Sequence, residues 1–129
     1  MERTFKLLVI DDSQEILAAL DKYLQQKKFD VTTAADGLEG LKILKAEEGG
    51  FDLVITDLVM PFVSGGGVIS ILKKEFPDTP VVAITGYGEH PEALALEANA
   101  DVVMEKPFDL DDLERQVNEL LARAAGSGS

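Results

Sequence analysis

The stretch LVITDLVMP, residues 53–61, decides the fold of this chain. Leu53, Val54 and Ile55 follow one another with no polar residue between them, which is typical of a strand buried on both faces of a parallel sheet. Asp57 then lies where this strand ends. Because ligands bind beyond the carboxyl ends of the strands in open α/β sheets, Asp57 is a candidate for chemistry. Taken alone, the stretch fits a turn that begins at an aspartate equally well.

Strand and helix patterns alternate on either side of this stretch. The alternation predicts one α/β domain, with a parallel sheet and helices on both faces. We expect this domain to span residues 1–124, and residues 125–129 to form a flexible tail, either a linker remnant or an expression scar. The predicted strands are 6–10, 29–35, 51–56, 81–84 and 101–105; the five predicted helices are 13–27, the segment from Leu38 to Gly49, the segment from Val68 to Phe76, the segment after Pro91 and the segment from Asp109 onward.

Composition narrows the class of protein. Hydrophobic residues make up 46% of the 129 residues and aromatic residues only 6%, so the core is aliphatic. The net charge of -12 repels nucleic acid and anionic membranes, which argues against direct binding to either. The chain has no cysteine and therefore no disulfide or thiol chemistry. With neither a signal peptide nor an apolar stretch long enough to span a membrane, the sequence predicts a cytoplasmic domain.

Polar residues follow four of the predicted strands. Asp11 and Asp12 end the first strand, Asp57 the third, Thr85 the fourth and Lys106 the fifth. The carboxyl ends of parallel strands share one edge of the sheet, so these side chains could converge. Crowded carboxylates repel one another, and Mg²⁺, which prefers oxygen ligands, relieves that repulsion. A carboxylate can also attack phosphorus, while a lysine and a hydroxyl hold the phosphate oxygens.

Each of these residues also has a simpler interpretation. Asp12 could cap the following helix, with Glu15 as the second member of a capping box. Thr85 could bond its own backbone, and Lys106 could be a solvated lysine before a proline. The occurrence of all of them at successive strand ends favours a common site.

This set of residues resembles the pattern of a response regulator receiver domain, the phosphoacceptor half of a two-component signalling pair. The resemblance extends over residues 5–123 and implies a flavodoxin-like, doubly wound, five-stranded parallel sheet of order 2-1-3-4-5 with five helices. The matching motifs are Val9-Ile10-Asp11-Asp12, Asp57-Leu58-Val59-Met60-Pro61 with Gly65 after it, Ile84-Thr85 and Lys106-Pro107-Phe108.

The resemblance also assigns roles by position. It implies that Asp57 accepts a phosphoryl group from a partner histidine kinase, and that Thr85 and Lys106 contact the phosphate. It implies that Mg²⁺ binds to Asp11, Asp12, Asp57 and the main-chain carbonyl of Val59. It further implies a cis peptide bond between Lys106 and Pro107.

The sequence departs from the family pattern at two positions, and the first of them carries an expectation of its own. Val103 stands where receivers usually have an aromatic ring, so we expect the switch to run through Thr85 and the loop 86–88, with Tyr87 as a candidate for the moving ring. Val59 and Tyr87 flank the expected phosphate and cannot activate water, which predicts a long-lived phosphorylated form. The other departure is Gly40, where an alanine is common. We expect the output surface to consist of the predicted helix after Pro91, strand five and the last helix. This surface would bind a partner protein or form a homodimer.

The predicted function is therefore a phosphorylation-controlled binding module that catalyses only its own phosphorylation and dephosphorylation. Its expected partners are a sensor histidine kinase or phosphotransfer protein, and a downstream target or output domain. A metal-dependent phosphohydrolase is the first alternative, but it would need an acid where Val59 stands. A flavin-binding protein would want a Ser/Thr-rich loop in place of Asp11-Asp12. A receiver-like scaffold that is never phosphorylated is the third alternative function.

Overall fold

A five-stranded parallel sheet forms the centre of the protein. The computed structural model describes residues 4–58, 65–86 and 100–127. The strand order is β2-β1-β3-β4-β5 and all four neighbouring pairs are parallel, which confirms the order expected from the resemblance. The strands are β1 (Lys6–Ile10), β2 (Asp30–Ala34), β3 (Leu53–Asp57), β4 (Val81–Thr85) and β5 (Val102–Glu105).

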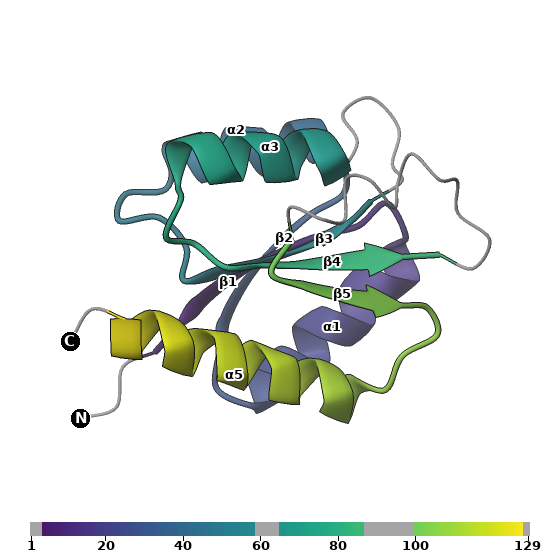
Figure 1. Ribbon diagram of the computed structural model, residues 1–129. Coiled ribbons are helices and arrows are strands. Elements are labelled where there is room, and N and C mark those ends of the chain that lie inside the picture. Colours follow the sequence, from purple (N-terminus) through teal and green to yellow (C-terminus); the bar gives the residue numbers. More distant parts are fainter. Residues whose placement is uncertain (1–3, 59–64, 87–99, 128–129) are drawn as a thin grey trace.

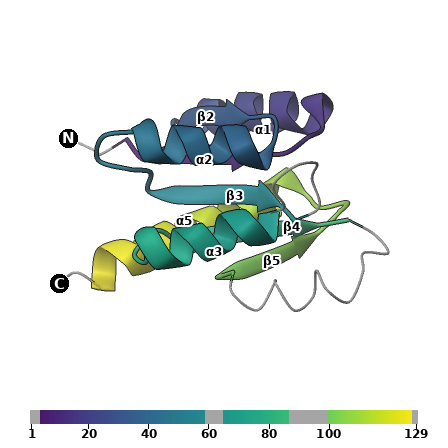
Figure 2. The ribbon, with the colours of Figure 1, turned by 90° about the horizontal axis from the view of Figure 1, so that it is seen from above.

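Helices cover both faces of this sheet (Figures 1 and 2). α2 and α3 lie on one face, and α1 and α5 on the other. The described ranges contain four helices rather than five, because the segment after Pro91 lies outside them. Within those ranges, none of the helices combines the length and apolar character needed to cross a membrane. The helices are α1 (Gln14–Gln26), α2 (Gly37–Ala46), α3 (Gly65–Glu75) and α5 (Leu110–Ser127).

The three central strands are buried on both faces, as their uninterrupted apolar runs predict. Leu53, Val54 and Ile55 have no exposed surface. Alternate residues of each strand feed two separate apolar clusters, one under α2 and α3 and one under α1 and α5. Leu8, Val54 and Ala83 belong to the first, and Leu7, Ile55 and Ile84 to the second. The sheet is thus held rigidly between two apolar layers, and its strand ends are fixed in place.

The N-cap of α1 is not the residue that one interpretation of the sequence suggested. Its N-cap is Ser13, whose hydroxyl accepts a hydrogen bond from the Ile16 N–H at 3.4 Å. The helix-cap interpretation of Asp12 is therefore wrong, because a hydroxyl one residue later already satisfies the first turn. Asp12 remains exposed at the end of β1.

The close approach of α2 to β1 explains why residue 40 is a glycine. A Cβ at Gly40 would lie 2.5 Å from Cδ1 and 3.0 Å from Cγ1 of Ile10. Ile10 is itself 1% exposed and so has little room to move away. The alanine that the family pattern favours would therefore crowd the residue directly before Asp11.

The last helix is longer than expected. α5 continues to Ser127, so the tail boundary that we placed at Ala125 falls inside a helix. Ala124 and Ala125 precede the only glycine of the final turn, and alanine has the highest helix propensity of all residues. That local preference favours continuation of the helix through the expected boundary at Ala125.

Candidate functional site

The structure brings the acidic strand-end residues together at one edge of the sheet. Asp11 and Asp12 follow β1, and Asp57 is the last residue of β3, the neighbouring strand. One carboxylate oxygen from each of the three lies within 4.8 Å of the others. The convergence expected from parallel strand ends is therefore present for all three acids.

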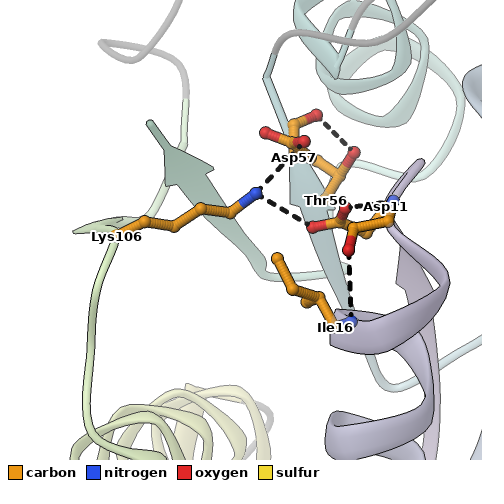
Figure 3. Close-up of polar contacts among 6 residues, drawn as sticks. Asp11, Ile16, Thr56, Asp57 and Lys106 are labelled. Carbon is orange, nitrogen blue, oxygen red and sulfur yellow. Dashed lines mark hydrogen bonds and ion pairs between the residues drawn. The ribbon is translucent and has the colours of Figure 1, made fainter. Parts of the chain in front are cut away.

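Lys106 closes this cluster from the other side (Figure 3). Its Nζ lies 3.4 Å from Oδ2 of Asp11 and 3.4 Å from Oδ2 of Asp57. Its backbone N–H donates to the carbonyl of Thr85 at 2.8 Å, which ties the residue after β5 to the end of β4. The peptide bond between Lys106 and Pro107 is cis, as the resemblance implied.

Asp11 is the most constrained of the three acids. It is 1% exposed, and its backbone N–H donates to the Ala34 carbonyl of β2 at 3.1 Å. Its Oδ1 accepts from the Ser13 N–H at 2.8 Å. Its Oδ2 is buried and has no hydrogen-bond donor among the residues that the structure describes, although the ammonium of Lys106 lies within ion-pair distance. A buried carboxylate oxygen without a donor is costly unless a cation satisfies it.

The electrostatics of the cluster disfavour an ionised Asp57. Burial, and then the charges of Asp11 and Asp12, raise the pKa of its carboxyl to about 6, while Lys106 acts in the opposite direction. Burial would lower the pKa of Lys106, but the charges of Asp57 and Asp11 outweigh this and raise it above its ordinary value. The site thus holds more negative charge than its single lysine can neutralise.

These residues fit a divalent cation of the Mg²⁺ type. Three carboxylates supply the hard oxygen ligands that such a cation prefers, and the Oδ2 of Asp11, which accepts no hydrogen bond within the described part of the chain, is a ready ligand atom. A cation would also offset the burial and the negative charges of Asp11 and Asp12, which together raise the pKa of Asp57. The fourth expected ligand, the carbonyl of Val59, lies outside the described residues, as does Tyr87.

Thr85 and Val103 occupy the neighbouring strands. Thr85 ends β4 and is 6% exposed; it pairs in register with Glu105, and its carbonyl receives the Lys106 N–H. Its expected contact between hydroxyl and phosphate stays a prediction. Val103, which stands where receivers usually have an aromatic ring, is 40% exposed on β5. An apolar side chain therefore remains at the surface of this edge strand.

Thr56 is a residue of the site that the sequence interpretation missed. It is fully buried within β3, and its hydroxyl donates to the carbonyl of Asp57 at 3.0 Å (Figure 3). A signal was present, since a threonine directly before the candidate nucleophile interrupts an otherwise apolar run.

An apolar hollow adjoins the lysine side of the site. It has a volume of about 570 Å³, and Lys106 and Gly86 lie at its border. Side chains from α1 and from the segment that precedes and begins α5 form most of its lining: Ile16, Ala19, Leu20, Pro107, Phe108 and Leu110. A partner protein with an apolar side chain could therefore contact the surface next to Lys106.

Comparison with known proteins identifies the family. The profile of the response regulator receiver domain matches residues 7–118, so the chain belongs to this family. The transcriptional regulatory protein PrrA of Mycobacterium tuberculosis is 34% identical over 125 residues, which cover 96% of this chain and 53% of that protein. The probable transcriptional regulator ycf27 of Porphyridium aerugineum is 38% identical, with 96% and 51% covered. The chain thus spans about half the length of these curated relatives.

Solved structures agree with this assignment. A receiver domain protein from Clostridium thermocellum has a TM-score of 0.84 and 34% identity, with 92% of this chain and 95% of that chain covered. The response regulator TrrA of Thermotoga maritima, solved in complex with Mg²⁺ and BeF, has a TM-score of 0.81 and 32% identity, with 91% and 99% covered. The flavodoxin-like receiver fold and the place of this chain in two-component signalling are therefore established.

Proposed function

We propose that this domain accepts a phosphoryl group on Asp57 and responds with a changed protein-binding surface. The observation that carries the proposal is the position of Lys106, whose Nζ lies 3.4 Å from both Asp11 and Asp57 beside a cluster of three carboxylates. The negatively charged oxygens of a transferred phosphoryl group need cations around them. Lys106 supplies one positive charge, and the three carboxylates can hold a divalent cation.

The transfer uses the ionised form of Asp57. With a pKa of about 6, this carboxyl is largely ionised at neutral pH and can attack phosphorus. The new P–O bond forms as the P–N bond of a phosphohistidine breaks, and the imidazole nitrogen leaves with the electron pair and takes up a proton. Lys106 offers positive charge to one phosphoryl oxygen, and the hydroxyl of Thr85 a hydrogen bond to another.

Asp11, Asp12 and Asp57 would hold Mg²⁺, with the Val59 carbonyl as a further ligand. Bound there, Mg²⁺ would neutralise the phosphoryl oxygens during transfer. The structure of the Thermotoga relative with Mg²⁺ and BeF supports this choice of metal. The protein would act as a catalyst only on itself, and its output would be binding rather than turnover.

We infer two kinds of partner. A sensor histidine kinase or a phosphotransfer protein would donate the phosphoryl group, and the apolar hollow beside Lys106 supplies a surface on which such a donor could dock. A downstream target or an output domain would receive the signal. The names of the curated relatives favour an output in transcription.

The output surface that we propose includes β5, α5 and the segment after Pro91 for which the sequence predicts a helix. The side chain of Val103 on β5 is 40% exposed, and a partner that covered it would remove apolar area from water. A homodimer through the last two helices and β5 is one form that this output could take.

The experiment that tests the proposed function is incubation with phosphoramidate and Mg²⁺, followed by mass spectrometry of the intact protein and its peptides. We expect one phosphoryl group on Asp57 of the wild-type protein and none on the Asp57→Asn variant. The Asp78→Asn variant, changed at an exposed turn, serves as the matched control and should be phosphorylated normally. A phosphorylated Asp57→Asn variant would contradict the proposal.

A further inference from the structure

The threonine that precedes the phosphoacceptor lies in an environment that does not suit a hydroxyl. Thr56 has no exposed surface and pairs in register with Ile10 on one side and Ala83 on the other. Both neighbours belong to the apolar cluster under α2 and α3. Valine has the same shape and would fill this position without burying a polar group, so packing alone gives no reason for a threonine.

The hydroxyl has a definite partner in the structure. It donates its proton to the carbonyl oxygen of Asp57 at 3.0 Å. The N–H of the same peptide group, which belongs to Leu58, donates to the carbonyl of Ile84 on β4 at 3.0 Å. The peptide group between Asp57 and Leu58 is therefore held at its carbonyl by the Thr56 hydroxyl and at its N–H by the neighbouring strand β4.

This peptide group controls where the carboxylate of Asp57 points. Its carbonyl carbon is attached to the Cα of Asp57, so a displacement of the group shifts this Cα and carries the side chain with it relative to Lys106 and Asp11. The reacting geometry is sensitive to such movements, since a displacement of about 1 Å can slow a reaction on the order of 100-fold. A smaller loss of order, from one missing hydrogen bond, should have a correspondingly smaller effect.

We propose, on the basis of the function proposed above, that Thr56 is a positioning residue for the phosphoacceptor. Its hydroxyl holds the peptide group between Asp57 and Leu58 in the orientation that aims the carboxylate at the incoming phosphorus. Thr56 itself does not touch the phosphoryl group, and its contribution passes through the backbone of Asp57.

The test compares Thr56→Val, which loses the hydroxyl, with Thr56→Ser, which keeps it. Thr32→Val, a change of the same type on β2, is the matched control because it lies away from the site. The rate of phosphorylation is measured at saturating Mg²⁺ over a range of phosphoramidate concentrations, and thermal unfolding is recorded for each protein. We expect Thr56→Val to remain folded and to show a maximal rate reduced about 3- to 10-fold with little change in the donor concentration for half-maximal rate. Thr56→Ser and Thr32→Val should stay within about twofold of the wild-type rate.

The outcomes separate this inference from the proposed function. A Thr56→Val variant as fast as the wild type would overturn the positioning role and leave the proposed function intact. A Thr56→Ser variant as slow as Thr56→Val would also overturn it, because the effect would then come from packing. A wild-type protein that takes up no phosphoryl group would remove both.

Discussion

Replacement of Asp57 by asparagine should stabilise the metal-free protein, and should do so increasingly as the pH rises. The carboxyl has a pKa of 3.8 when unperturbed and of about 6 in the folded protein, chiefly because it is buried and next because Asp11 is close. The folded state therefore binds this proton more tightly than the unfolded state, and ionisation reduces the stability of the fold. The reduction is absent well below pH 3.8, grows between pH 3.8 and about 6, and is complete above that range.

The size of the effect follows from the two pKa values. Each pKa unit corresponds to about 1.4 kcal/mol, so a rise from 3.8 to about 6 amounts to about 3 kcal/mol once both states are ionised. At pH 5 the folded carboxyl is still mostly protonated, and the same two values predict a reduction of only about half that size. Because asparagine resembles the protonated acid, the stability advantage of Asp57→Asn over the wild type should be about 3 kcal/mol at pH 7.5 and about half of that at pH 5.

Urea unfolding followed by circular dichroism, in the presence of a chelator, measures this difference at both pH values. Asp78→Asn is the control and should show no such trend, since its carboxylate is exposed. Addition of Mg²⁺ at pH 7.5 should stabilise the wild type by about 2.7 kcal/mol when the metal exceeds its dissociation constant 100-fold, and should stabilise Asp57→Asn less because one ligand is lost. A stability difference that stays constant between pH 5 and pH 7.5, or that falls, would refute the electrostatic account of the site.

Three further changes test other contacts. Asp12→Ala should weaken Mg²⁺ binding, measured by calorimetry, at least 10-fold if the exposed acid is a ligand, and unchanged affinity would remove it from the ligand set. Lys106→Met should raise the pKa of Asp57, since Lys106 lowers it, and should slow phosphorylation by phosphoramidate; a rate equal to that of the wild type would show that the lysine is dispensable. Gly40→Ala should destabilise the fold by about 1–3 kcal/mol through the clash with Ile10, and Ile10→Val should make the alanine less costly; two additive effects in urea unfolding would contradict this coupling.

Several features of the fold and site could be predicted from the sequence because they depend on local patterns. Leu53, Val54 and Ile55 have to be buried on both faces wherever their strand lies, and their lack of exposed surface confirms this. The carboxyl ends of parallel strands share an edge in any arrangement of the sheet, so Asp11 and Asp57 were expected at one edge, where they could converge. The strand order, in contrast, was predicted from the family resemblance and not from the residues themselves.

The tertiary structure alone decided which groups are in contact. The sequence suggested Asp12 as a possible cap of the first helix, whereas the backbone conformation and side-chain hydrogen bond at Ser13 make the serine the N-cap. The distances of 3.4 Å from Lys106 to both Asp11 and Asp57 join segments about 50 to 95 residues apart, and no local pattern specifies them. The hydrogen bond of the Thr56 hydroxyl and the need for a glycine at position 40 also follow from tertiary contacts and not from a local pattern.

Residue type and spacing along the chain thus determined the layers of this protein and the edge of the sheet at which its chemistry lies. The contacts within that edge depend on how closely β1, β3 and α2 pack, which is set by side chains from all three elements together. The pKa of about 6 at Asp57 illustrates the difference, because an isolated aspartate titrates near 3.8 and only burial beside Asp11 raises it. The sequence by itself could name this residue as the candidate nucleophile, whereas its electrostatic state arises only when the strands are assembled.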